Sequence, residues 1–148
     1  MRSLLDVNVL IALLDQDHVD HGLVRTWLAA EIEHGWSSCA ITQNGVVRLM
    51  SQPRYPNALT PAEVIERLGR AASTEHHEYW SSSVSVLDAG LVDRTAVLGP
   101  RQVTDVYLLA LATVRGGRFV TLDRTVPRAA VPTARPEHLM VIGEPPRR

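Results

Sequence analysis

The sequence predicts an α/β fold in which a parallel sheet of about five strands is covered by helices on both faces. Short apolar segments alternate along the chain with longer segments whose apolar residues recur at helical spacing. At 148 residues, the chain has the length of one domain, and no repeat or linker divides it. We therefore expect residues 1–142 to form a single domain and residues 143–148 to form a mobile tail.

The first half of the chain carries clear start and stop signals. In order, we expect a strand over 3–6, a helix from about 8 to 14, a helix from about 20 to 34, a strand over 36–41, and helices from 42 to 52 and from 61 to 72. Gly35 stops the second helix, and Thr42 is predicted to cap the third. Thr60, Pro61 and Glu63 combine an N-cap, a proline at the first helical position and a capping-box acid.

The second half ends in two further strands. We expect a short strand over 78–80, a short helix within 89–97, a long helix from about 101 to 115, and strands over 118–122 and 139–142. Gly99 and Pro100 break the chain before the long helix, and Gly116 with Gly117 ends it.

Composition narrows the range of functions. All fifteen basic residues are arginines, which excludes a lysine Schiff base or a P-loop lysine. A net charge of −1 gives no global attraction for nucleic acid, so RNA binding would need a local arginine patch. Cys39, the only cysteine, lies in an apolar segment and is expected to be a buried small residue. We expect a cytoplasmic protein without a membrane span.

Three aspartates stand where an open parallel sheet places its site, beyond the carboxyl ends of its strands. Asp6 ends the first strand, Asp123 ends the strand FVTL, and Asp105 lies at the start of the long helix. Each alone could cap or begin a helix. Together they would repel one another unless a cation is present, and Mg²⁺ suits an open carboxylate cluster.

Four ordered motifs, LLDVNVLIALL, ITQNGVVRLMSQP, RQVTDVYLLALA and FVTLDR, resemble the PIN-domain family, and most closely the VapC-type toxins of toxin–antitoxin pairs. The resemblance implies a three-layer α/β/α sandwich and an endoribonuclease that depends on Mg²⁺ or Mn²⁺ and hydrolyses RNA with a metal-activated water. It also implies a homodimer inhibited by a small antitoxin. Asp6, Asp105 and Asp123 occupy the metal-binding positions of the family, and Asn8 and Thr104 are auxiliary polar residues in the same motifs.

One position departs from the family pattern. Gln43 stands where the family usually has a glutamate, so the cluster loses one negative charge, and the neighbouring Asn44 could supply an oxygen. Arg101 and Arg124 flank the acids and are candidate phosphate contacts.

Two other functions remain open from the sequence. Gln43 could weaken metal binding until the chain is a PIN-like module that only binds RNA or a protein. A phosphoacceptor domain also gathers acids at strand ends, but it would usually need a lysine, which this chain lacks.

Overall fold

The computed structural model describes residues 1–145 and has the three layers expected of the sequence. Five strands form one parallel sheet in the order β3-β2-β1-β4-β5. The strands are β1 (Ser3–Leu5), β2 (Trp36–Cys39), β3 (His77–Trp80), β4 (Arg118–Thr121) and β5 (Leu139–Val141). The predicted fold class is therefore confirmed.

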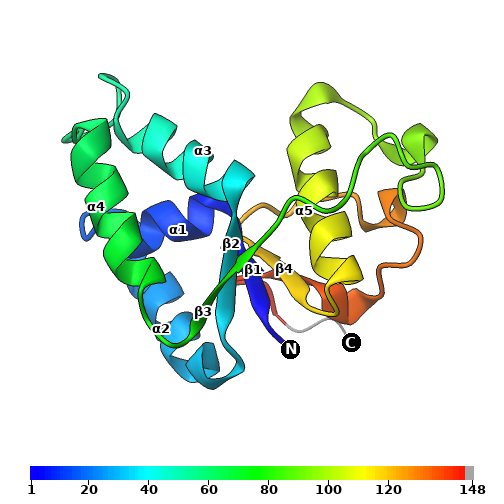
Figure 1. The fold of residues 1–148 in the computed structure, drawn as a ribbon, viewed down its shortest axis with the longest axis horizontal. Coiled ribbons are helices and arrows are strands. Elements are labelled where there is room, and N and C mark those ends of the chain that lie inside the picture. The colour runs from blue at the N-terminus through cyan, green and yellow to red at the C-terminus, as the bar shows by residue number, and fades with distance from the viewer. Residues whose placement is uncertain (146–148) are drawn as a thin grey trace.

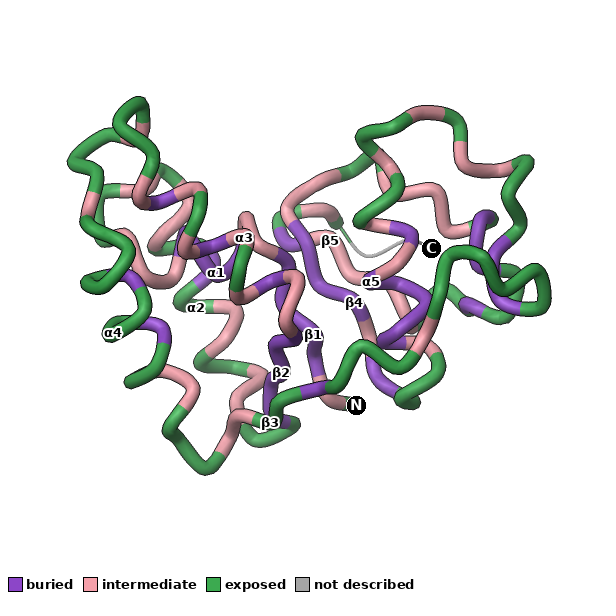
Figure 2. Tube along the Cα trace, turned by 45° about the horizontal axis from the view of Figure 1, so that its top comes forward, coloured by how far each residue is buried: buried purple, intermediate pink, exposed green. Residues whose placement is uncertain are grey.

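Helices cover both faces of this sheet (Figure 1). The helices α1 (Val7–Leu14), α2 (His21–Glu31), α3 (Ala40–Met50) and α4 (Pro61–Ala72) lie on one side, and α5 (Val103–Val114) lies on the other. Each face has its own apolar core: Leu5, Val9 and Val120 belong to the first, and Leu4, Leu109 and Phe119 to the second. Because β1 and β4 contribute to both cores, all residues of β1 and all residues of β4 except Arg118 are buried (Figure 2).

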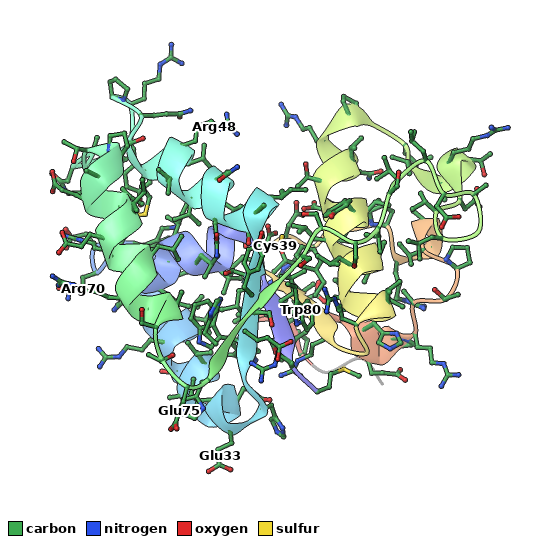
Figure 3. The ribbon with its side chains drawn as sticks, viewed as in Figure 1. Glu33, Cys39, Arg48, Arg70, Glu75 and Trp80 are labelled. Carbon is green, nitrogen blue, oxygen red and sulfur yellow. The ribbon has the colours of Figure 1, made fainter. Side chains whose placement is uncertain are left out.

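The start of α3 differs from the prediction. The strand expected to reach Ile41 ends at Cys39, which is the N-cap of α3, so Thr42 lies inside the helix and is not its cap. The Thr42 hydroxyl accepts from the Cys39 N–H at 3.0 Å, and this hydrogen bond ends the strand early. Cys39 is fully buried, as expected, and lies in the interior in Figure 3.

Smaller differences occur at other element ends. Asp6 and Leu122 lie just beyond β1 and β4, because Asp6 caps α1 and the chain turns after Thr121. Within 89–97, where a short helix is predicted, the structure has one short helix of the 3-10 type at Arg94–Ala96. In that segment Asp93 accepts from the Thr95 N–H at 3.0 Å, which favours a tight turn.

The other short turns are also of the 3-10 type. They lie at Ile32–His34, Pro100–Gln102, Arg128–Ala130 and Pro136–His138. Of the predicted tail, residues 146–148 lie outside the described residues. None of the helices formed by residues 1–145 is both long and apolar enough to cross a lipid bilayer.

Candidate active site

A cavity of about 560 Å³ brings together the three aspartates singled out in the sequence. Asp6 reaches it from the end of β1, Asp123 from the turn after β4, and Asp105 from the first turn of α5. β1 and β4 are adjacent parallel strands, so their carboxyl ends meet at one edge of the sheet. We call this space the acid cavity.

Asp6 is both a helix cap and a wall of the acid cavity. Its side chain is 6% exposed, and its Oδ1 accepts from the Val7 N–H at 2.7 Å. Its Oδ2 accepts from the Thr121 hydroxyl at 2.6 Å. Burial raises the pKa of Asp6, the hydrogen bonds from Thr121 and Val7 act against that rise, and the charge of Asp123 adds to it. Two hydrogen bonds thus hold Asp6 in one orientation, and burial makes its ionised form less favourable.

Thr121 links the ends of β1 and β4, and sequence analysis missed it. Its fully buried hydroxyl donates to Asp6 and accepts from the Asp123 N–H at 3.0 Å and from Asn8 Nδ2 at 3.2 Å. A threonine in a strand is ordinary, so the only signal was its place two residues before Asp123 in FVTLD.

Asn8 and Asp123 fix the turn that follows β4. The Oδ1 of Asn8 accepts from the Leu122 N–H at 3.2 Å, while its amide donates to Thr121. One oxygen of Asp123 accepts from both the N–H and the hydroxyl of Thr125, each at 2.7 Å. The other carboxylate oxygen of Asp123 is not used in this turn.

Asp105 has no such support. Among the residues that the structure describes, no side chain forms a hydrogen bond or an ion pair with its carboxylate. Burial, together with the charges of Asp6 and Asp123, raises the pKa of Asp105 to about 7. A cation between these carboxylates would relieve the repulsion, so the donor set suits a hard divalent ion.

The three carboxylates surround the cavity without closing on one point. Within residues 1–145, no group of three His, Cys, Asp or Glu side chains is positioned as a complete metal-binding set. Mg²⁺ usually takes one or two protein carboxylates and keeps several waters, so an open arrangement of this kind is compatible with it.

Three other predicted polar residues, Gln43, Asn44 and Thr104, do not line the acid cavity. Gln43 and Asn44 line a different cavity, between α3 and α4. Gln43 Nε2 also donates to Oγ of the buried Ser38 in β2 at 3.0 Å. Ser38 Oγ is in turn 2.8 Å from His77 Nε2. Thr104 is exposed and is not part of the acid-cavity lining.

The two candidate arginines differ. Arg101 lines the acid cavity from the turn before α5. Arg124 does not line it, and its Nε lies 4.0 Å from Glu144 Oε1. The structure adds to the lining four polar side chains that were not predicted for the site: His18, Gln52, Arg54 and Tyr55. They come from loops, where no periodic pattern marks which side chain faces a site.

Comparisons with known proteins agree with this geometry. The PIN domain family model matches residues 3–132. Ribonuclease VapC44 of Mycobacterium tuberculosis is 56% identical over 142 residues, which cover 96% of this chain and 100% of that protein. Ribonuclease VapC39 of the same species is 39% identical, over 88% of this chain and 94% of its own length.

A solved structure shows the same fold at low sequence identity. VapBC2 from Rickettsia felis, crystallised bound to a DNA fragment from its promoter, superposes with a TM-score of 0.63 at 13% identity. The match covers 95% of this chain and 97% of that one. The family model and the two ribonucleases span most of the chain, so this protein belongs to the PIN-domain family, among its VapC-type ribonucleases.

Proposed function

We propose that the chain is a metal-dependent endoribonuclease and the toxin of a toxin–antitoxin pair, acting on cytoplasmic RNA. The observation that carries this proposal is the convergence of Asp6, Asp105 and Asp123 on one cavity. The relatives named ribonucleases support the same activity. We also propose a small antitoxin as partner and a homodimer as the assembly, as the family resemblance implies.

Asp6, Asp105 and Asp123 would hold Mg²⁺ or Mn²⁺. When bound, such an ion lowers the pKa of a water and offsets the charge that develops on the phosphate. The residues of the chain orient the donor oxygens. Thr121 and the Val7 N–H hold Asp6, Thr125 holds one oxygen of Asp123, and Asp105 contributes a carboxylate with no other partner among residues 1–145.

Substrate positioning is assigned to arginine side chains. We propose that Arg101, which lines the acid cavity, contacts an RNA phosphate, and that Arg124, beside Asp123 in the chain, makes a weaker contact. An arginine fits a phosphate with two parallel hydrogen bonds, which positions the backbone without reading its sequence.

The binding-module alternative has less support. Three carboxylates line the acid cavity without any contribution from Gln43. The variant Gln43→Glu separates the two functions. A large gain in Mg²⁺-dependent cleavage would indicate an attenuated nuclease, and the absence of cleavage from both forms would favour a binder.

The test of the proposed function is RNA cleavage by the purified chain. We expect cleavage with Mg²⁺ or Mn²⁺, no cleavage with a chelator, and no cleavage by Asp6→Ala with either ion. Undiminished cleavage by Asp6→Ala would refute the assignment of this site.

A further inference from the structure

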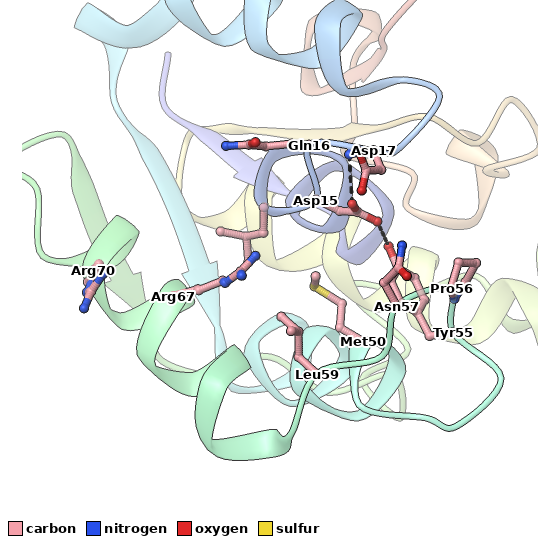
Figure 4. Close-up of a pocket in the computed structure, with 11 residues that line it drawn as sticks. Asp15, Gln16, Asp17, Met50, Tyr55, Pro56, Asn57, Leu59, Arg67 and Arg70 are labelled. Carbon is pink, nitrogen blue, oxygen red and sulfur yellow. Dashed lines mark hydrogen bonds between the residues drawn. The ribbon is translucent and has the colours of Figure 1, made fainter.

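A second cavity continues the acid cavity on the far side of Tyr55. It measures about 500 Å³ and is lined by the end of α1, the loop after α3, and α4 (Figure 4). Tyr55 and Pro56 line both cavities, so the two spaces meet at these residues. We call the second space the Arg67 cavity, after the arginine that α4 contributes to its lining.

Tyr55 is held in place at this junction. Its phenol donates a hydrogen bond to Asp15 Oδ2, and burial together with this contact raises the Tyr55 pKa. The Tyr55 N–H donates to the Gln52 carbonyl at 2.9 Å. Asn57 takes a left-handed φ of 56°, which asparagine tolerates better than most residues, and so turns the chain back toward α4. The aromatic ring is thus a fixed surface between the cavities.

Each of the two cavities has in its lining an arginine without an ion-pair partner among the described residues. Arg54 lines the acid cavity and Arg67 lines the Arg67 cavity. Neither forms an ion pair within residues 1–145, whereas Arg70, also in the Arg67 cavity, is bound to Glu66 at 2.6 Å. Both guanidinium groups therefore remain available for a ligand.

Acids of the Arg67 cavity weaken its attraction for anions but do not remove it. The carboxylate of Asp15 is already bound by the Tyr55 phenol and by the Asp17 N–H at 3.0 Å. The carboxylate of Asp17 is exposed, so solvent screens its charge. A ligand that binds here should therefore gain more from the aromatic ring than from charge.

We propose that the two cavities form one groove for single-stranded RNA, in which a nucleobase beside the cleaved phosphate stacks on Tyr55 and flanking phosphates contact Arg54 and Arg67. Unpaired RNA bases stack on aromatic side chains, and arginines bind the backbone between them. This inference deepens the proposed function, since it assumes that RNA is cleaved in the acid cavity.

The test is RNA binding without cleavage. The probe is a fluorescein-labelled, unstructured RNA of about 20 nucleotides, titrated in low salt with a chelator and followed by fluorescence anisotropy. We expect Tyr55→Ala to weaken the Kd about fivefold or more, since stacking contributes about that factor per base. Arg54→Ala and Arg67→Ala should each weaken it about threefold or more.

Matched variants separate stacking from other causes. Tyr55→Phe keeps the ring and should stay within about threefold of the wild type. Arg25→Ala removes an exposed arginine of α2 that lines neither cavity, and it should stay within about twofold. Duplex RNA offers no unpaired base, so its binding should not respond to Tyr55→Ala.

Several results would refute the proposal that the two cavities form an RNA groove. They are an unchanged Kd in Tyr55→Ala, an equal loss in Tyr55→Phe, an equal loss in Arg25→Ala, or no binding of the probe. A chain that binds the probe through Tyr55 but cleaves no RNA would refute the proposed nuclease and keep the groove. If the wild type cleaves RNA and Tyr55→Ala does not weaken binding of the probe, the groove is refuted and the proposed nuclease is kept.

Discussion

Of the three aspartates of the acid cavity, only Asp105 has no hydrogen bond within residues 1–145 to stabilise its ionised carboxylate. Its pKa of about 7 exceeds the usual value of 3.8, so between these values the folded chain keeps a proton that the unfolded chain releases. The stabilising contribution of the neutral carboxyl is therefore present in acid and is lost as the pH rises through about 7.

Asp105→Asn should remove this dependence. In chelator, we expect the variant to unfold at a higher temperature than the wild type near pH 8 and at about the same temperature near pH 4. Thermal unfolding followed by circular dichroism at both pH values measures it. The control is Glu33→Gln, which replaces an exposed acid that does not line the acid cavity and should show no such difference. An equal shift at both pH values would contradict the raised pKa.

The hydroxyl of Thr121 should contribute to both the stability of the fold and the rate of cleavage. Thr121→Val keeps the volume but leaves Oδ2 of Asp6 without its donor, and leaves the Asn8 amide and the Asp123 N–H without an acceptor. We expect a loss of about 1–3 kcal/mol in the free energy of unfolding, together with weaker cleavage. Thr121→Ser restores the hydroxyl and should recover most of both. Urea unfolding of the two variants compares them, and a Val variant as stable as the Ser variant would refute this role.

The packing of α3 against α1 depends on Gly45. A Cβ at Gly45 would lie 2.7 Å from Cγ2 of Val7, the residue after Asp6, so the Val7 side chain or one of the two helices must shift. Gly69, in α4, has no atom within 4 Å of the same position. Replacing either glycine with alanine improves helix propensity by about 1 kcal/mol, so packing decides the difference between Gly45→Ala and Gly69→Ala.

We therefore expect the two substitutions to change the free energy of unfolding in opposite directions. Gly45→Ala should lower the free energy of unfolding by about 1–3 kcal/mol, because overpacking costs more than propensity gains. Gly69→Ala should raise it by about 0.5–1 kcal/mol. Urea unfolding of both variants gives the comparison, and stabilisation by Gly45→Ala would contradict the close approach of α1 and α3.

Elements with local signals could be predicted, and elements set by tertiary contacts could not. Thr60 and Glu63 form the capping box that the sequence predicts at the start of α4. The N-cap at Cys39 was missed, because cysteine is not a usual cap and Thr42 acts here from the third helical position. The segment 81–98 has few apolar residues in a regular pattern, and its path follows from packing onto α5.

The whole chain should respond to a divalent ion. A ligand that binds the folded state stabilises it in proportion to the logarithm of its concentration over Kd. We expect millimolar Mg²⁺ to raise the unfolding temperature of the wild type near pH 8, where Asp105 is ionised, and to leave Asp105→Asn unchanged. Equal shifts in both proteins would show that Mg²⁺ binds elsewhere.

The convergence of Asp6, Asp105 and Asp123 could be anticipated because parallel strands end at one edge of a sheet, and that rule needs only the order of elements. The contribution of Thr121 and Tyr55 could not, because each depends on a side chain far away in sequence: Thr121 on Asp6, and Tyr55 on Asp15. Gln43 was grouped with the acids by motif, yet its amide donates to the buried Ser38 and its side chain lines another cavity.

Asp105→Asn tests the acid cavity with little structural disturbance. Asp6 caps α1 and binds Thr121, so its replacement alters the fold as well as the site, whereas Asp105 has no hydrogen-bond partner within residues 1–145. The measurement is the rate of Mg²⁺-dependent RNA cleavage by Asp105→Asn beside the wild type. We expect a folded variant that cleaves about 100-fold more slowly or not at all. A folded variant that cleaves within about twofold of the wild-type rate would contradict the assignment of these carboxylates to the reaction.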